Sequence, residues 1–182
     1  MVVSFPGGPA AAPGADDPLA LLSACHGRIT RQCATLARLA AHLPVHGSDE
    51  AAQTAAASVR RYFDTAAAHH HDDEEEDLFP ALIDAMAGSD AGCLHALVRG
   101  LVDEHRRLAS LWTPLRQALS EIAAGRAAAL SAEQVREFTQ AYAAHIQREE
   151  DELLPMAARL IADDALTAIG QAMKARRGGE AG

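Results

Sequence analysis

Apolar residues recur every three or four positions over four long stretches of the chain, and this spacing limits the fold more than any other feature. In an α-helix such positions share one face, which must be buried against other helices. The stretches cover residues 17–44, 48–88, 89–125 and 131–161, with short breaks between them. Long helices with short connections predict an antiparallel up-down four-helix bundle.

The composition agrees with an all-α protein, because alanine is abundant and aromatic residues make up only 4% of the 182 residues. A shorter stretch, "DDALTAIGQAMKARR" at 163–177, predicts an additional C-terminal helix. Residues 1–17 are rich in glycine and proline and are expected to form a flexible N-terminal segment. We therefore assign residues 18–177 to one bundle domain.

Charge and cysteine content bear on the cellular setting. The chain has 16 Lys and Arg against 25 Asp and Glu, and its basic pairs are dispersed, which disfavours nucleic-acid binding. No stretch resembles a signal peptide or has the length of a membrane span, so no membrane contact is expected. Three cysteines without a CxxC pair fit a reducing compartment, and we predict a cytoplasmic protein. Cys25 is expected to be a buried, inert thiol rather than a redox-sensitive one.

Each predicted long helix carries one histidine where its apolar face requires a core residue, and two helices add a glutamate four residues later. Residues four apart lie about 5–6 Å from each other on one helix face. Two buried carboxylates beside four imidazoles would be costly unless a cation lay among them. The two histidine–glutamate pairs suggest two metal ions. The residues predicted to form this buried metal site are His26, His70, Glu74, His105, His145 and Glu149.

The chain repeats part of this pattern. The motif HxxxEExxL(F/L)P occurs at residues 70–80 and again at 145–155, so its positions are separated by 75 residues. A repeat of this kind predicts a pseudo-twofold bundle in which the second and fourth helices supply equivalent ligands.

These motifs resemble the hemerythrin-like (HHE cation-binding) domain family over roughly residues 26–155. The resemblance implies a four-helix bundle with a non-haem di-iron centre, held by the six residues named above. The LFP and LLP endings fix the register within the run 69–71 and select His70. One position departs from the family: oxygen-carrying members have HxxxH on the third helix, and here Leu101 stands four residues before His105. That departure argues against reversible oxygen carriage.

Several assignments stay open. Histidine and carboxylate ligands suit Fe, Mn or Zn, and the resemblance favours two iron ions with an oxo or hydroxo bridge. His71 and Glu75 form a second pair about 100° around the helix, either as supporting residues of the site or as part of a solvated face. No metal role is expected for three further histidines, His42, His46 and His95. Four acids, Asp72, Asp73, Glu76 and Asp77, are expected at the surface.

The expected function is to bind or sense dioxygen or a related small oxidant, such as peroxide or nitric oxide. A di-iron enzyme that reduces peroxide or nitric oxide, or that repairs iron clusters, is the alternative. Cluster repair is disfavoured because residues 1–17 contain no cysteine, which the N-terminal segment of repair proteins in this family often carries. A third possibility is a bundle with a purely structural metal. The sequence leaves open whether the protein is an enzyme and whether it has a protein partner.

Overall fold

A computed structural model of the chain describes residues 17–86 and 91–178, and within these ranges it consists of helices and short turns without a β-strand. Almost all of the expected flexible segment 1–17 lies outside the described residues, as does the expected start of the third helix near residue 89. The α-helices are α1 (Pro18–His46), α2 (Glu50–Asp64), α3 (Ala66–Asp72), α4 (Phe79–Ala85), α5 (Ala91–Ala123), α6 (Ala132–Arg148), α7 (Leu154–Leu160) and α8 (Asp163–Gly178). Two π-helical segments, η1 (Asp73–Leu78) and η2 (Glu149–Leu153), connect α3 to α4 and α6 to α7.

Polar side chains define the helix starts that the sequence predicts. Asp17 accepts hydrogen bonds from the backbone of the first turn of α1, and Asp49 does the same for α2. Ser131 accepts from the backbone N–H of Gln134 at the start of α6. Each of these residues satisfies helix N–H groups that have no partner within the helix.

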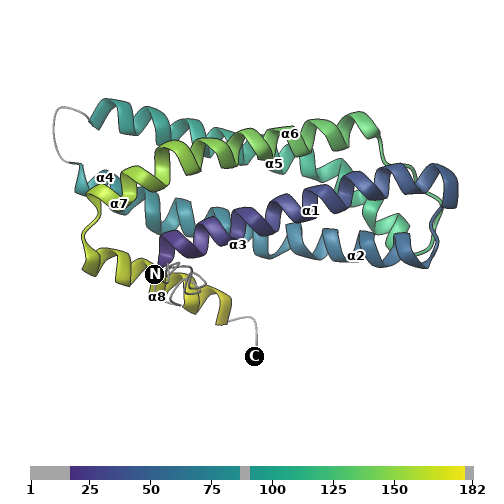
Figure 1. The fold of residues 1–182 in the computed structure, drawn as a ribbon, viewed down its shortest axis with the longest axis horizontal. Helices are drawn as coiled ribbons and strands as arrows, with labels where there is room; N and C mark the ends of the chain where they lie inside the picture. Colours follow the sequence, from purple (N-terminus) through teal and green to yellow (C-terminus); the bar gives the residue numbers. More distant parts are fainter. Residues whose placement is uncertain (1–16, 87–90, 179–182) are drawn as a thin grey trace, which may run out of the picture.

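The long helices form one bundle. α1 packs against α2 and α6, and α5 packs against the same two helices. Figure 1 shows these helices side by side, with α8 along one end of the bundle. The prediction of an all-helical bundle is confirmed. Among the described residues, none of the helices combines the length and the apolar character that a membrane crossing requires.

The second and fourth predicted helices are not continuous α-helices. Pro80 was expected to kink the second helix or to end its first part, whereas the interruption of the fourth helix corrects the sequence prediction. Each contains a π-helical segment directly before a proline-containing helix, at Pro80 and at Pro155. Proline has no N–H to donate to the carbonyl four residues back, so the helix loses a regular hydrogen bond there. The wider turns close through bonds from Phe79 N–H to the carbonyl of Glu74 and from Leu154 N–H to the carbonyl of Glu149. Both π turns therefore hold a predicted ligand residue.

Asp73 is also a correction, because its side chain is fully buried rather than on the surface. It pairs with Arg176 and Arg177 at the end of α8. α8 packs on η1 and α1, and two of its apolar residues, Ile169 and Met173, are buried there. The two guanidinium groups supply the opposite charge that a buried carboxylate requires.

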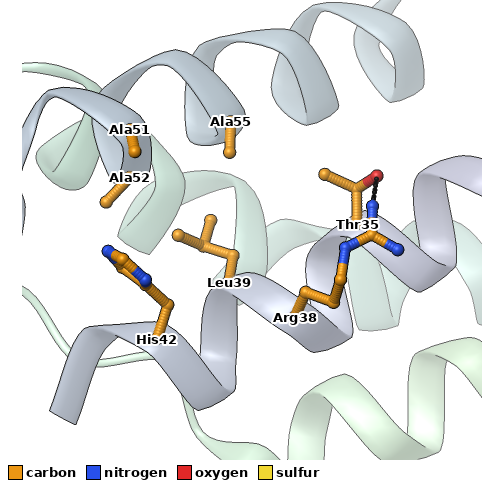
Figure 2. Close-up of a pocket in the computed structure, with 7 residues that line it drawn as sticks. All are labelled: Thr35, Arg38, Leu39, His42, Ala51, Ala52 and Ala55. Atoms are coloured by element: carbon orange, nitrogen blue, oxygen red, sulfur yellow. Dashed lines mark hydrogen bonds between the residues drawn. The ribbon is translucent and has the colours of Figure 1, made fainter. Parts of the chain in front are cut away.

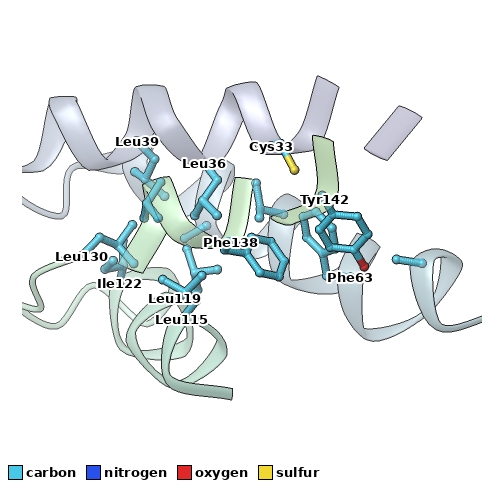
Figure 3. Packing of buried hydrophobic residues seen from close by; sticks show 14 of the residues in the cluster. Cys33, Leu36, Leu39, Phe63, Leu115, Leu119, Ile122, Leu130, Phe138 and Tyr142 are labelled. Carbon is cyan, nitrogen blue, oxygen red and sulfur yellow. The ribbon is translucent and has the colours of Figure 1, made fainter. Parts of the chain in front are cut away.

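Two apolar clusters fill the bundle, and the predicted metal ligands lie between them. The first cluster, part of which appears in Figure 3, includes Leu36, Phe63, Phe138 and Tyr142. The second includes Leu22, Leu78, Leu101 and Leu153 beside α8. On each of the four chain segments, the predicted histidine lies between a residue of one cluster and a residue of the other. The polar site is thereby enclosed by apolar packing on both sides.

Candidate metal centre

The structure brings all six predicted ligand residues together in the bundle interior. Their exposed fractions run from 0% to 5%. Glu149 places one carboxylate oxygen 3.1 Å from Nε2 of His26 and the other 3.1 Å from Nε2 of His145. Glu74 places one oxygen 3.5 Å from Nε2 of His70 and the other 3.3 Å from Nε2 of His105. Each glutamate therefore lies between two histidines, one at each oxygen.

A fifth histidine joins the cluster, and the sequence prediction did not include it among the ligands. The ligand atoms of His71, His105 and His145 all lie within 4.8 Å of one another. The ring of His71 stacks on that of His105, with 4.0 Å between centroids. Its Nε2 is buried and has no hydrogen-bond partner. Two features of the sequence could have indicated His71. The histidine that the family pattern expects on the third helix is replaced by Leu101, and His71 directly follows the predicted ligand His70.

The histidines thus fall into two groups on either side of the glutamates. One group, which we call the His26 subsite, consists of His26 and His70. The other, the His71 subsite, consists of His71, His105 and His145. Since Glu74 and Glu149 each direct one oxygen to either group, the arrangement has the form of a site for two cations with shared carboxylates.

Carboxylates outside the cluster orient three of these imidazoles. Nδ1 of His26 donates to Glu150 at 2.6 Å, and Nδ1 of His105 donates to Glu75 at 2.6 Å. Glu75 and Glu150 are equivalent positions of the 75-residue repeat, and Glu75 thus contacts a predicted ligand rather than lying only on a solvated face. A carboxylate on Nδ1 fixes the ring and leaves Nε2 to face the cluster, an arrangement common around metal-bound histidines.

The third outer carboxylate, Glu104, was not singled out from the sequence. Nδ1 of His145 donates to it at 2.9 Å, and Arg148 donates to its other oxygen at 2.7 Å. Gly100 leaves the space for that guanidinium, because a Cβ there would lie 2.8 Å from Nη1 of Arg148. Glu104 stands directly before the predicted ligand His105, but its carboxylate contacts His145. The sequence alone does not show which ring it reaches.

Whether a metal fits this site can be judged from the buried nitrogen and oxygen atoms that have no hydrogen-bond partner. Nε2 of all five histidines and all four oxygens of Glu74 and Glu149 are buried without a hydrogen-bond partner. Lone pairs that face one another at 3.1–3.5 Å in a dry interior repel unless protons or cations lie between them. Nitrogen and carboxylate donors without a thiolate match iron, manganese or zinc. The donor set fits a pair of such ions.

The pKa values of the buried histidines and glutamates indicate which of these groups carry protons when no metal is bound. Burial alone would lower the pKa of His105, but contacts with Glu149 and Glu74 raise it to about 10. Burial and the charge of Glu149 raise the pKa of Glu74 to about 8. Burial lowers the pKa of His70 to about 3, so this ring is neutral near pH 7. Protons therefore take the place of cations in the metal-free site, and metal binding would release them.

Comparison with known proteins agrees with this site. The family model described as the hemerythrin HHE cation binding domain matches residues 17–157. The chain is also 32% identical over 162 residues to an uncharacterized protein of Haemophilus influenzae, covering 89% of this chain and 91% of that one. The family description names cation binding, and the buried histidine and glutamate cluster lies within the matched residues. The chain therefore belongs to the hemerythrin HHE cation-binding domain family.

Proposed function

We propose that the cluster holds two iron ions and that the protein binds or senses dioxygen or a related small oxidant. The observation that carries this proposal is the set of five imidazole nitrogens and four carboxylate oxygens that converge without hydrogen-bond partners. The proposal includes the antiparallel up-down four-helix bundle expected from the sequence, and the packing of α1 and α5 against α2 and α6 supports it. Manganese and zinc suit the same donors, and the family membership favours iron.

Each residue has a role in this proposal. His26 and His70 would hold one ion, and His71, His105 and His145 would hold the other. Glu74 and Glu149 would contribute one oxygen to each ion, because their oxygens already face both subsites. When bound, the iron pair would supply one-electron redox changes and open positions for dioxygen, peroxide or nitric oxide.

The two subsites differ in how many ligands they offer. The His26 subsite offers two nitrogens and, from the glutamates, two oxygens, whereas the His71 subsite offers three nitrogens and two oxygens. An octahedral ion takes about six ligands, so the His26 subsite leaves more positions open. We therefore assign the incoming small molecule to the His26 subsite. The apolar clusters on both sides would keep bulk water from that position.

The presence of His71 also changes the argument about oxygen carriage. The sequence disfavoured it because the third helix lacks a second histidine at Leu101. His71 gives the cluster a fifth imidazole from α3 instead. Reversible dioxygen binding is accordingly included in the proposal, together with peroxide and nitric oxide as ligands. A cytoplasmic location is part of it as well, supported by the free thiols of Cys25, Cys33 and Cys93.

The test begins with the metal content of protein purified without oxygen from iron-supplemented cells. About two iron per chain are expected in the wild type, and fewer in His71→Ala, because that variant removes one nitrogen ligand. His95→Ala is the matched control, since His95 is exposed on α5. Protein without iron, or with a full complement in His71→Ala, would contradict the assignment.

The second step exposes the ferrous protein separately to dioxygen, peroxide and nitric oxide and records its absorption spectrum. A ligand-specific change that reverses on ligand removal supports binding or sensing. Turnover of peroxide or nitric oxide would instead support the enzyme alternative. Two iron per chain with no spectral response to any of the three would leave a purely structural metal and reject the proposed function.

A further inference from the structure

A second group of metal-ligating side chains lies at the opposite end of α1, where the chain turns into α2. His42 and His46 are one helical turn apart, and their rings stack with 4.3 Å between centroids and 24° between planes. Asp49 faces them from the start of α2, with both carboxylate oxygens 3.0 Å from Nε2 of His42. The ligand atoms of these three residues all lie within 4.8 Å of one another.

The turn that presents these residues is fixed by its own hydrogen bonds. Gly47 has a φ of 64°, which favours glycine, and its N–H donates to the carbonyl of Leu43 at 2.9 Å. Ser48 donates through Oγ to the carbonyl of Arg126 at 2.9 Å. One oxygen of Asp49 accepts from the N–H of Ala52 at 2.8 Å as the cap of α2. The three ligand residues are therefore held in position before any ion arrives, which lowers the entropic cost of binding.

The position also favours a cation electrostatically. The carbonyl groups at the end of α1 carry the partial negative charge of the helix dipole, and His46 is the last residue of that helix. The hydrogen bond from Ala52 and the proximity of His42 hold the pKa of Asp49 below its ordinary value, so this carboxylate is charged near pH 7. A divalent ion here would meet one full and several partial negative charges.

Solvent and ions can reach these side chains. The side chain of His42 is 31% exposed and that of Asp49 is 40% exposed. His42 lies at one end of a groove of about 270 Å³ whose other wall is formed by Ala51, Ala52 and Ala55 (Figure 2). Arg38, which also lines the groove, is directed to Thr35, which accepts its hydrogen bond at 2.9 Å.

We propose that His42, His46 and Asp49 form a surface site for a divalent transition-metal ion of the zinc class. Two imidazoles and one carboxylate are a common donor set for Zn²⁺, with water in the remaining position. No metal role was expected for these histidines because they lie near the break between two predicted helices, off the buried face, and His42 has no acid four residues later. The acid comes instead from across the turn, seven residues after His42. The site shares no residue with the bundle centre and does not depend on the proposed iron.

The test titrates the iron-loaded protein with Zn²⁺ in competition with a chromophoric zinc chelator, and iron is measured before and after. About one Zn²⁺ per chain should bind with no loss of iron. His46→Ala and Asp49→Asn should each lower the affinity at least about tenfold, because even the loss of a supporting residue around a metal costs that much. Asparagine is as good a helix cap as aspartate, so Asp49→Asn separates loss of the ligand from loss of the α2 cap.

His95→Ala serves as the control for a solvent-exposed histidine on another helix, and it should bind Zn²⁺ like the wild type. Each melting temperature should stay at the wild-type value, which shows that the variants are folded. Absence of bound Zn²⁺, equal affinity in all variants, or binding of Zn²⁺ only with release of iron would overturn the proposal. The iron content measured before the titration tests the proposed function separately, so failure of the zinc proposal is distinct from failure of the proposed function.

Discussion

The contact of α8 with the π-helical segment η1 gives a prediction whose size follows from burial and charge. The carboxylate of Asp73 is fully buried and pairs with both Arg176 and Arg177. Arg176 also pairs with Asp77 and with Glu76, at 2.9 Å and 2.8 Å, so it is held even without Asp73. Replacing both arginines by alanine would leave Asp73 buried without an opposite charge.

Breaking a buried ion pair by removing one side costs about 3–5 kcal/mol, because the remaining charge stays unsolvated. Burial already raises the pKa of Asp73 despite the two guanidinium groups, which shows how large the desolvation cost is. For a chain of this length each kcal/mol lowers the melting temperature by about 2–4 °C, so the double variant should melt about 6–20 °C below the wild type. A single Arg177→Ala change should cost less, because Arg176 stays in place.

Calorimetry of the iron-loaded protein measures this loss of stability. Arg159→Ala, on the exposed face of α7, is the control, and its free energy of unfolding should change by no more than about 0.5 kcal/mol. Adding Asp73→Asn to the double variant separates two causes. If the unpaired charge is responsible, the neutral amide should recover most of the stability. A double variant as stable as the wild type, or one that Asp73→Asn does not rescue at all, would refute the reasoning.

Three further predictions concern the site and the thiols. Glu75→Gln and Glu150→Gln should each weaken iron binding about 10–100-fold, because each carboxylate orients a histidine. Competition with an iron chelator measures the affinity, and an unchanged affinity would contradict that role. The exposed thiol of Cys93 should react with an alkylating reagent in the native protein, whereas Cys33, whose pKa burial raises to about 12, should react only after unfolding; mass spectrometry distinguishes the two. Removal of iron by a chelator should lower the melting temperature in calorimetry, because binding to the native state stabilises it, and an unchanged value would argue against a metal in the core.

Much of this architecture follows from local rules that the sequence displays. Capping residues such as Asp49 and Ser131 mark helix starts, and the three-to-four spacing of apolar residues identifies the buried face. The same spacing places His70 with Glu74 and His145 with Glu149, because residues four apart share a face whatever the rest of the fold does. The composition of the site was predictable where it depended on one helix at a time.

The remaining features depend on departures from the ideal helix or on contacts between distant segments. His71 was placed about 100° from the buried face, and the sequence does not show the end of α2 at Thr65 or the π turn that begins at Asp73. Asp73 belonged to a run of acids that looks solvated until α8, about 100 residues later, covers it. Glu104 reaches a ring 41 residues away. Periodicity carries no information about such pairings.

The repeat itself explains why the centre combines symmetry with one difference. Glu75, on the first half of the chain, orients His105 on the second, and Glu150 on the second half orients His26 on the first. Glu104 orients His145 within the second half, but His26 and His105 are each oriented from the other half, so a site with all three rings oriented requires both hairpins to be docked. The symmetry fails at His71, whose equivalent 75 residues later is Ile146, packed against the apolar cluster. That single difference gives one subsite three imidazoles and the other two. A pair of bound metal ions would thus be chemically distinct, and an incoming ligand would have one preferred place to bind.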